Sequence, residues 1–164
     1  MKMKLVAGLV TFGLVLTPTA KGAPSLDSKT KAQLVYLVEE EKLARDVYVN
    51  LAGISRKFQN ISKSEITHMG YVSQILKSYG INDPTIGSKP GNFKNKNLAA
   101  LYKKIMASAK NYYSNAMASG VLIEETDIAD LDKLLAQTKN ADVILMANKL
   151  LNGSQNHLKA FRTQ

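Results

Sequence analysis

Residues 61–79 read ISKSEITHMGYVSQILKSY, and apolar side chains recur along them in alternating steps of three and four. This spacing is typical of a helix with one buried face. Ile61, Val72 and Ile75 fall on that face, but two of its positions carry Glu65 and His68. The segment is therefore expected to be a helix that turns two ionisable side chains toward the core.

Three further segments have the same spacing, namely residues 34–51, 117–135 and 143–161. Glu41 interrupts the apolar stripe of residues 34–51, and Glu124 interrupts that of residues 117–135. Ser154 and His157 interrupt the stripe of residues 143–161. Both histidines of the chain thus fall on stripes that are expected to be buried. Tyr48, on the stripe of residues 34–51, is expected mainly as a core side chain, with a hydrogen bond to the site as the alternative.

Breakers of regular structure cluster in residues 80–97, which read GINDPTIGSKPGNFKNKN and are expected to form a long connection. Residues 98–109 are expected to form a further short helix. Asp27, Ser62 and Asn140 are expected to cap helix starts. No sustained period-two pattern indicates a strand. The chain is therefore predicted to be all-α, with four long helices and a long connection between the second and the third, as in single-crossover bundles of the ferritin type.

The composition excludes several classes of site. The 164 residues contain no Cys, which excludes disulfides, thiolate zinc sites, iron–sulfur clusters and cysteine nucleophiles. The net charge is +9, and much of the excess lies in lysines around the connection. Because aromatic and Arg residues are not interleaved with these lysines, no nucleic-acid partner is expected.

Residues 1–22 have the order of a secretory signal, with lysines first, then an uncharged apolar run over residues 5–16, then small residues. Cleavage is expected near Gly22, which leaves residues 23–164 as one domain. The run is shorter than the ~20 residues that span a bilayer, so no stable membrane insertion is expected after cleavage, although an uncleaved anchor is the alternative. The protein is expected to be exported, either periplasmic or secreted.

The polar interruptions of the stripes suggest a metal site. A lone buried carboxylate costs several kcal/mol, roughly, and a shared cation would remove that cost. Glu65 and His68 are three residues apart and so lie on one helix face. Carboxylates with imidazoles suit iron or manganese, with zinc as a further alternative. The competing interpretation is that Glu41, Glu65 and Glu124 pair with basic residues such as Lys42 at the bundle surface.

At these residues the chain resembles the ferritin-like superfamily and, within it, an uncharacterised bacterial and archaeal family with a domain of unknown function. The stretches that carry the resemblance are EEEKLARDVY (39–48), NISKSEITHM (60–69), IEETDIADL (123–131) and GSQNHLKAF (153–161). More distantly, they resemble rubrerythrin-like di-iron proteins, whose first helix carries Glu-x-x-Ala-Arg-x-x-Tyr and whose second carries Glu-x-x-His.

This resemblance implies a metal site whose ligands are Glu41, Glu65, His68, Glu124, Asp127 and His157. The fourth helix departs from the pattern, because Ser154 stands where a Glu is expected. Either Asp127 or a water held by Ser154 could compensate, or the site could hold one metal or none. Glu39 and Glu40 fall off the stripe and are expected to be solvated. Arg45 and Asp46 are expected either to orient ligands or to form an ordinary surface pair.

The implied function is a metal-binding protein with a di-iron or single-metal centre that reacts with dioxygen or peroxide, as an oxidase or peroxidase would. The alternative is a non-catalytic helical binding module with a structural metal or none. A homodimer is possible. A ferritin cage is not expected, because the chain has no further C-terminal helix after residue 161.

Overall fold

The computed structural model describes residues 25–163, which form five helices and no strand. The helices are α1 (Ser28–Leu51), α2 (Arg56–Ser78), α3 (Lys96–Ala109), α4 (Tyr113–Gln137) and α5 (Ala141–Arg162). The predictions of an all-α protein and of a short helix after the long connection are confirmed. The expected signal segment, residues 1–22, lies outside the described residues. Within residues 25–163, no helix combines the length and the apolar character needed to cross a membrane.

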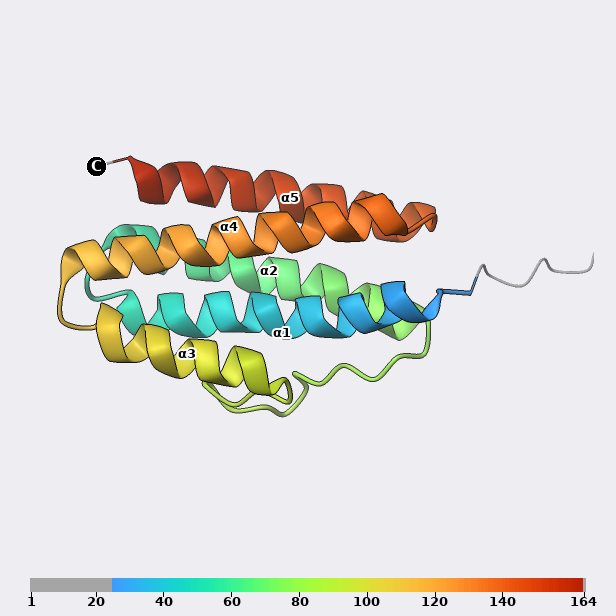
Figure 1. Ribbon diagram of the computed structural model, residues 1–164, viewed down its shortest axis with the longest axis horizontal. Helices are drawn as coiled ribbons and strands as arrows, with labels where there is room; N and C mark the ends of the chain where they lie inside the picture. Colours follow the sequence, from blue (N-terminus) through green and yellow to red (C-terminus); the bar gives the residue numbers. More distant parts are fainter. Residues whose placement is uncertain (1–24, 164) are drawn as a thin grey trace, which may run out of the picture.

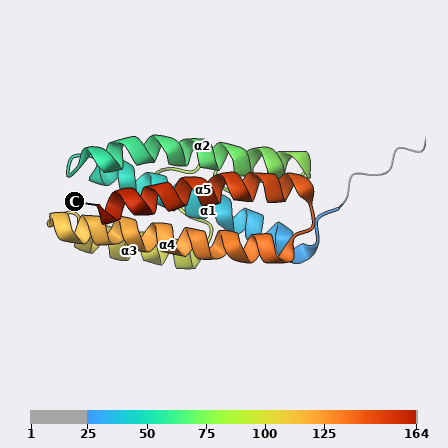
Figure 2. The same ribbon diagram turned by 90° about the horizontal axis from the view of Figure 1, so that it is seen from above.

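The four long helices lie side by side along the long axis of the molecule (Figures 1 and 2). α1 packs against α2 and α4, and α5 packs against the same two helices. The shorter α3 lies outside this group and contacts α1 and α4. Side chains from all four long helices therefore have access to one shared interior.

Capping residues fix where the helices begin. The Asp27 carboxylate accepts hydrogen bonds from the main-chain N–H groups of Lys29 and Thr30, each at 2.9 Å, as expected for the N-cap of α1. Ser55, and not Ser62, is the N-cap of α2. The expectation for Ser62 was wrong because the helix extends two turns further toward its N-terminus, and there it buries Phe58 in the core.

The apolar core consists of two clusters, one toward each end of the long helices. The first contains Tyr48, Phe58 and Phe161, whose ring centroids lie 5.1–5.7 Å apart. The second contains aliphatic side chains that include Leu34 and Leu131. Full burial of such a side chain contributes about 1.5–3 kcal/mol. The polar interruptions of the stripes fall between the two clusters along each helix, where this apolar stabilisation offsets their cost.

A polar face of α1 holds the long connection between α2 and α3, which runs along this helix (Figure 1). Glu39 is buried and accepts hydrogen bonds from the main-chain N–H groups of Lys94 and Asn95. The expectation that Glu39 is solvated was wrong, because the connection folds over it. A carboxylate bound by two N–H groups orders the start of α3.

Lys42 and Asp46, on the same face, form a buried ion pair at 2.6 Å. The Lys42 ammonium also donates to the carbonyl of Lys89, and Asp46 accepts from the N–H of Gly91 and from Arg45. Arg45 and Asp46 are therefore paired with each other, and Asp46 binds the connection.

Candidate metal centre

The structure brings all six predicted site residues together in the interior. They come from α1, α2, α4 and α5, and each is at most 9% exposed: Glu41, Glu65, His68, Glu124, Asp127 and His157. Within residues 25–163, none of the four carboxylates of this set forms an ion pair with Lys or Arg. The alternative of pairing with basic residues at the bundle surface is therefore wrong.

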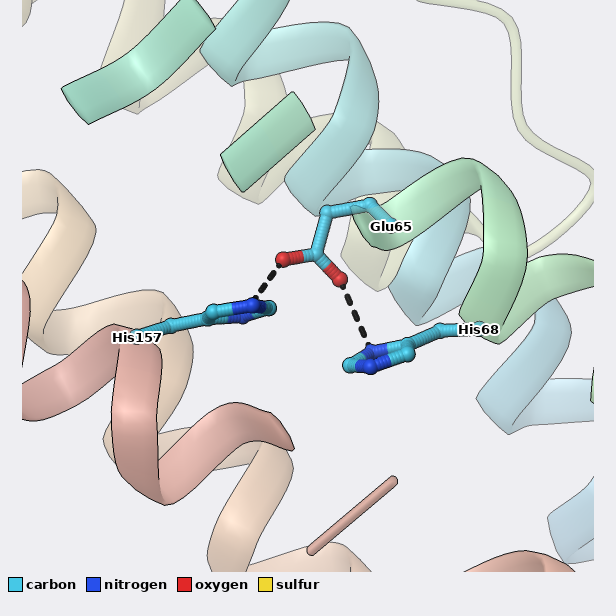
Figure 3. A group of neighbouring side chains, drawn as sticks. All are labelled: Glu65, His68 and His157. Carbon is cyan, nitrogen blue, oxygen red and sulfur yellow. Dashed lines mark ion pairs between the residues drawn. The ribbon is translucent and has the colours of Figure 1, made fainter. Parts of the chain in front are cut away.

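Glu65 reaches both imidazole rings, with one carboxylate oxygen toward each (Figure 3). Its Oε2 is 3.1 Å from Nδ1 of His68, and its Oε1 is 2.8 Å from Nδ1 of His157. These three residues each offer a ligand atom, and the atoms lie within 4.8 Å of one another. In the described part of the chain this is the one group of three or more His, Cys, Asp or Glu residues that meets this distance.

The two histidines turn the same nitrogen toward the carboxylates. His68 Nδ1 is 3.3 Å from Glu41, and His157 Nδ1 is 3.5 Å from Glu124. The rings are stacked, with centroids 5.3 Å apart. Neither Nδ1 makes a contact with the alignment of a hydrogen bond. These carboxylate oxygens and imidazole nitrogens are close together but not hydrogen-bonded to one another. This arrangement would leave them available as ligands of one cation.

Asp127 reaches the cluster because the buried face of α4 differs from the expected one. Ala116, Ile123 and Leu134 are buried, whereas Ile128 is only partly so. The interior face is thus shifted by about one position toward Asp127, and only the resemblance pointed to this residue. Oδ2 of Asp127 accepts a hydrogen bond from the Ser154 hydroxyl at 2.6 Å. Ser154 therefore holds an acid of α4 where a Glu on α5 was expected.

Tyr48 combines a packing role with a polar one. Its ring lies against Phe58 and Phe161, and its hydroxyl donates to Oε1 of Glu124 at 2.6 Å. From the sequence, the packing role was mainly expected and the hydrogen bond was the alternative, and the structure shows both. The bond fixes one oxygen of Glu124 and leaves Oε2 toward His157.

Burial and neighbouring charges shift the pKa values of the side chains in the cluster in different directions. Burial would raise the pKa of Glu65, but the adjacent His157 and His68 lower it to about 2. Burial would lower the pKa of His157, but Glu124 and Glu65 raise it to about 10. Burial, followed by the charge of Asp127, raises the pKa of Glu41 well above its ordinary value. Glu41 therefore holds a proton more tightly than a free carboxylic acid does, and Glu65 holds one less tightly.

The donor set fits a divalent metal. Nδ1 of both histidines and one oxygen each of Glu41 and Glu65 are buried and have no hydrogen-bond partner. Such groups are rare in folded proteins, because each costs about 1–3 kcal/mol when left unpaired. Carboxylate oxygen together with imidazole nitrogen suits iron, manganese or zinc. A bound cation would satisfy these atoms at once.

Glu40 is the residue that the sequence prediction missed. It is 3% exposed, and its Oε2 has no hydrogen-bond partner. The expectation that it is solvated was wrong, because the face of α1 that carries it packs against α4. Three consecutive acids, Glu39, Glu40 and Glu41, point to different faces of one helix. This run could have indicated that more than one face of α1 is covered.

The fold and the site define an all-helical protein with a buried Glu/His cluster. The chain belongs to the family described as Uncharacterized protein domain (DUF2202), whose model matches residues 30–164. It is similar to a protein from Methanocaldococcus jannaschii, named Uncharacterized protein MJ0754, with 39% identity over 138 residues that cover 83% of this chain and 75% of the relative. The crystal structure of hypothetical protein MJ0754 matches with a TM-score of 0.82 at 37% identity, over 87% of this chain and 83% of that one.

Proposed function

We propose that the protein is an exported, ferritin-like metal-binding protein, in which the buried Glu/His cluster holds iron, with manganese or zinc as alternatives. The observation that carries this proposal is the group of Glu65, His68 and His157, whose buried ligand atoms lie within 4.8 Å of one another without forming a hydrogen-bonded network. A shared cation would stabilise two rings and several acids that are gathered away from water.

The long helices support the ferritin-like part of the proposal. α1, α2, α4 and α5 pack in neighbouring pairs, with the long connection and α3 between the second and third of them. Each contributes at least one ionisable side chain to the interior, as in carboxylate-bridged metal proteins with four-helix bundles. The proposal of export rests on the charged, apolar and small-residue order of residues 1–22.

Glu65, His68 and His157 would bind the metal ion. Glu41, next to His68, and Glu124, next to His157, would supply further carboxylate ligands. Bound iron would supply the redox chemistry with dioxygen or peroxide. The protein would hold the ligands in position and exclude water from the site. The Tyr48 hydroxyl and the Ser154 hydroxyl each hold one acid in place, in the way that outer partners orient the ligands of other metal sites.

Metal binding by the purified chain tests the proposal. We expect the metal-depleted protein to take up ferrous iron or manganese under anaerobic conditions, measured by equilibrium dialysis and elemental analysis. Glu65→Gln should weaken binding by more than the roughly 10–100-fold that loss of an outer partner costs. The matched control is Glu125→Gln, because Glu125 is exposed and pairs with Arg162 at the surface. That variant should bind as the parent protein does.

Absence of uptake by the parent protein would overturn the proposal. In that case Glu65→Gln should leave metal content at zero and change only the free energy of unfolding. Where iron is bound, oxygen consumption on admission of air then separates a reactive centre from a structural metal.

A second candidate function is a non-catalytic binding module with a structural metal or none. The observation that favours it is Ser154, since α5 supplies one imidazole and no acid to the centre. Uptake of zinc that raises stability, with no oxygen consumption after loading with iron, would support this candidate.

A further inference from the structure

Two carboxylate oxygens remain unused on the α4 side of α1. They are Oε2 of Glu40 and Oδ1 of Asp127, which are both buried and without a hydrogen-bond partner. Glu40 is 3% exposed and Asp127 is 5% exposed. Glu65 and the histidines do not account for them, because neither oxygen contacts an imidazole nitrogen within 4.0 Å.

Hydrogen bonds between α1 and α4 fix which turns of the two helices face each other. Near one end, the Gln33 side chain donates to the main-chain carbonyl of Asp130 at 2.7 Å. Further along α1, Tyr48 donates to Glu124. Ascending residue numbers on α1 thus match descending numbers on α4, so the two helices are antiparallel.

Glu40 lies between Gln33 and Tyr48 on α1, and Asp127 lies midway between Glu124 and Asp130 on α4. The two acids therefore occupy facing turns. The Ser154 hydroxyl occupies the other oxygen of Asp127.

The chemistry of this pair differs from that of the Glu65 group. No imidazole takes part, so only oxygen ligands are present. With Glu40 and Asp127 alone, water molecules would complete the coordination shell. Hard divalent cations such as Mn²⁺ and Mg²⁺ accept one or two carboxylates together with water.

We propose that Glu40 and Asp127 form a second cation position between α1 and α4, which takes a hard divalent ion through oxygen ligands. This inference rests on the proposed function, since it adds a position to the same buried centre. The acid expected at position 154 is then replaced from another helix: Glu40 of α1 supplies the carboxylate, and Ser154 holds its partner Asp127. The second position binds more weakly than the first, because it has fewer protein ligands.

Manganese binding by two neighbouring glutamate variants tests the inference. Metal-free protein is titrated with Mn²⁺, and free Mn²⁺ is followed by electron paramagnetic resonance. We expect two ions per chain for the parent protein, with a tighter and a weaker step. Glu40→Gln should lose the weaker step and keep the tighter one. Glu39→Gln is the matched control, since both oxygens of Glu39 bind the main chain of residues 94 and 95. It should lower the thermal midpoint and retain both steps.

The outcomes separate the two proposals. Two steps in Glu40→Gln, or a single step in the parent protein, would overturn the second position and leave the first intact. No Mn²⁺, iron or zinc bound by the parent protein would overturn the proposed function as well. If Glu39→Gln does not fold, Glu125→Gln replaces it as the control, because Glu125 is exposed on α4.

Discussion

Gly153 of α5 leaves room for the imidazole of His68, a candidate metal ligand. A Cβ added there would lie 2.5 Å from Nε2 of His68. The imidazole of α2 can therefore approach the backbone of α5, beside the His157 ring, only because position 153 has no side chain. Its Nε2 faces Gly153 while Nδ1 faces the acids.

We expect Gly153→Ala to displace the His68 ring and to weaken metal binding by about tenfold. Overpacking costs roughly 1–3 kcal/mol, partly offset by the ~1 kcal/mol that Ala gains over Gly in a helix. Gly70→Ala is the matched control, because nothing lies within 4 Å of a Cβ at that position of α2. It should raise the free energy of unfolding and leave metal affinity unchanged. Equal metal affinity in both variants would contradict this role of Gly153.

At the scale of elements, α1 is covered on three faces, and each face carries at least one charged residue. Glu41 turns toward the imidazoles, Glu40 toward α4, and the face with Glu39, Lys42 and Asp46 toward the connection. The last face keeps polar groups buried by binding main-chain atoms of residues 89–95. α1 is therefore held from outside the centre as well as from within.

Asp46→Ala should loosen the connection without altering the metal count. It leaves the Lys42 ammonium buried without its carboxylate, and breaking a buried pair in this way costs about 3–5 kcal/mol. Urea unfolding should report this loss. Limited proteolysis should show faster cleavage within residues 80–95. Parent-like stability would mean that the Lys42 ammonium is satisfied by the Lys89 carbonyl alone.

At the scale of the whole molecule, the concentration of buried acids sets the pH dependence of the metal-free protein. The pKa values of Glu41 and Asp127 are raised well above their ordinary values by burial and by neighbouring acids. The unfolded chain therefore releases these protons first, and stability falls as pH rises above about 4–4.5. The pKa of Glu65, lowered to about 2 by the histidines against the effect of burial, contributes stability that is present above 4.5 and lost as pH falls toward 2.

The pKa of His157 extends this trend to alkaline pH. Its folded value of about 10 exceeds its ordinary value of 6.5, so its contribution is complete below 6.5 and is lost as pH rises through 10. We expect the thermal midpoint of metal-free protein to decline from pH 6.5 to 10. Saturating Mn²⁺ should reduce or reverse the decline, because metal binding requires deprotonated ligands. The same slope with and without metal would contradict metal binding by these acids.

The sequence by itself determined the helices and most residues of the buried Glu/His cluster. Helix periodicity is local, so the polar residues at buried positions can be identified from each segment alone. Helix periodicity identified five residues of the cluster from their own segments, namely Glu41, Glu65, His68, Glu124 and His157. Only the tertiary structure decided which neighbouring helix covers each further face, since that depends on residues far away in the chain. It buried Glu40 against α4, placed Ser154 on Asp127, and folded residues 89–95 over Lys42 and Asp46. The hydrogen bonds of Ser154, Lys42 and Asp46 join residues 27 to 47 positions apart, and local helix periodicity does not indicate such pairs.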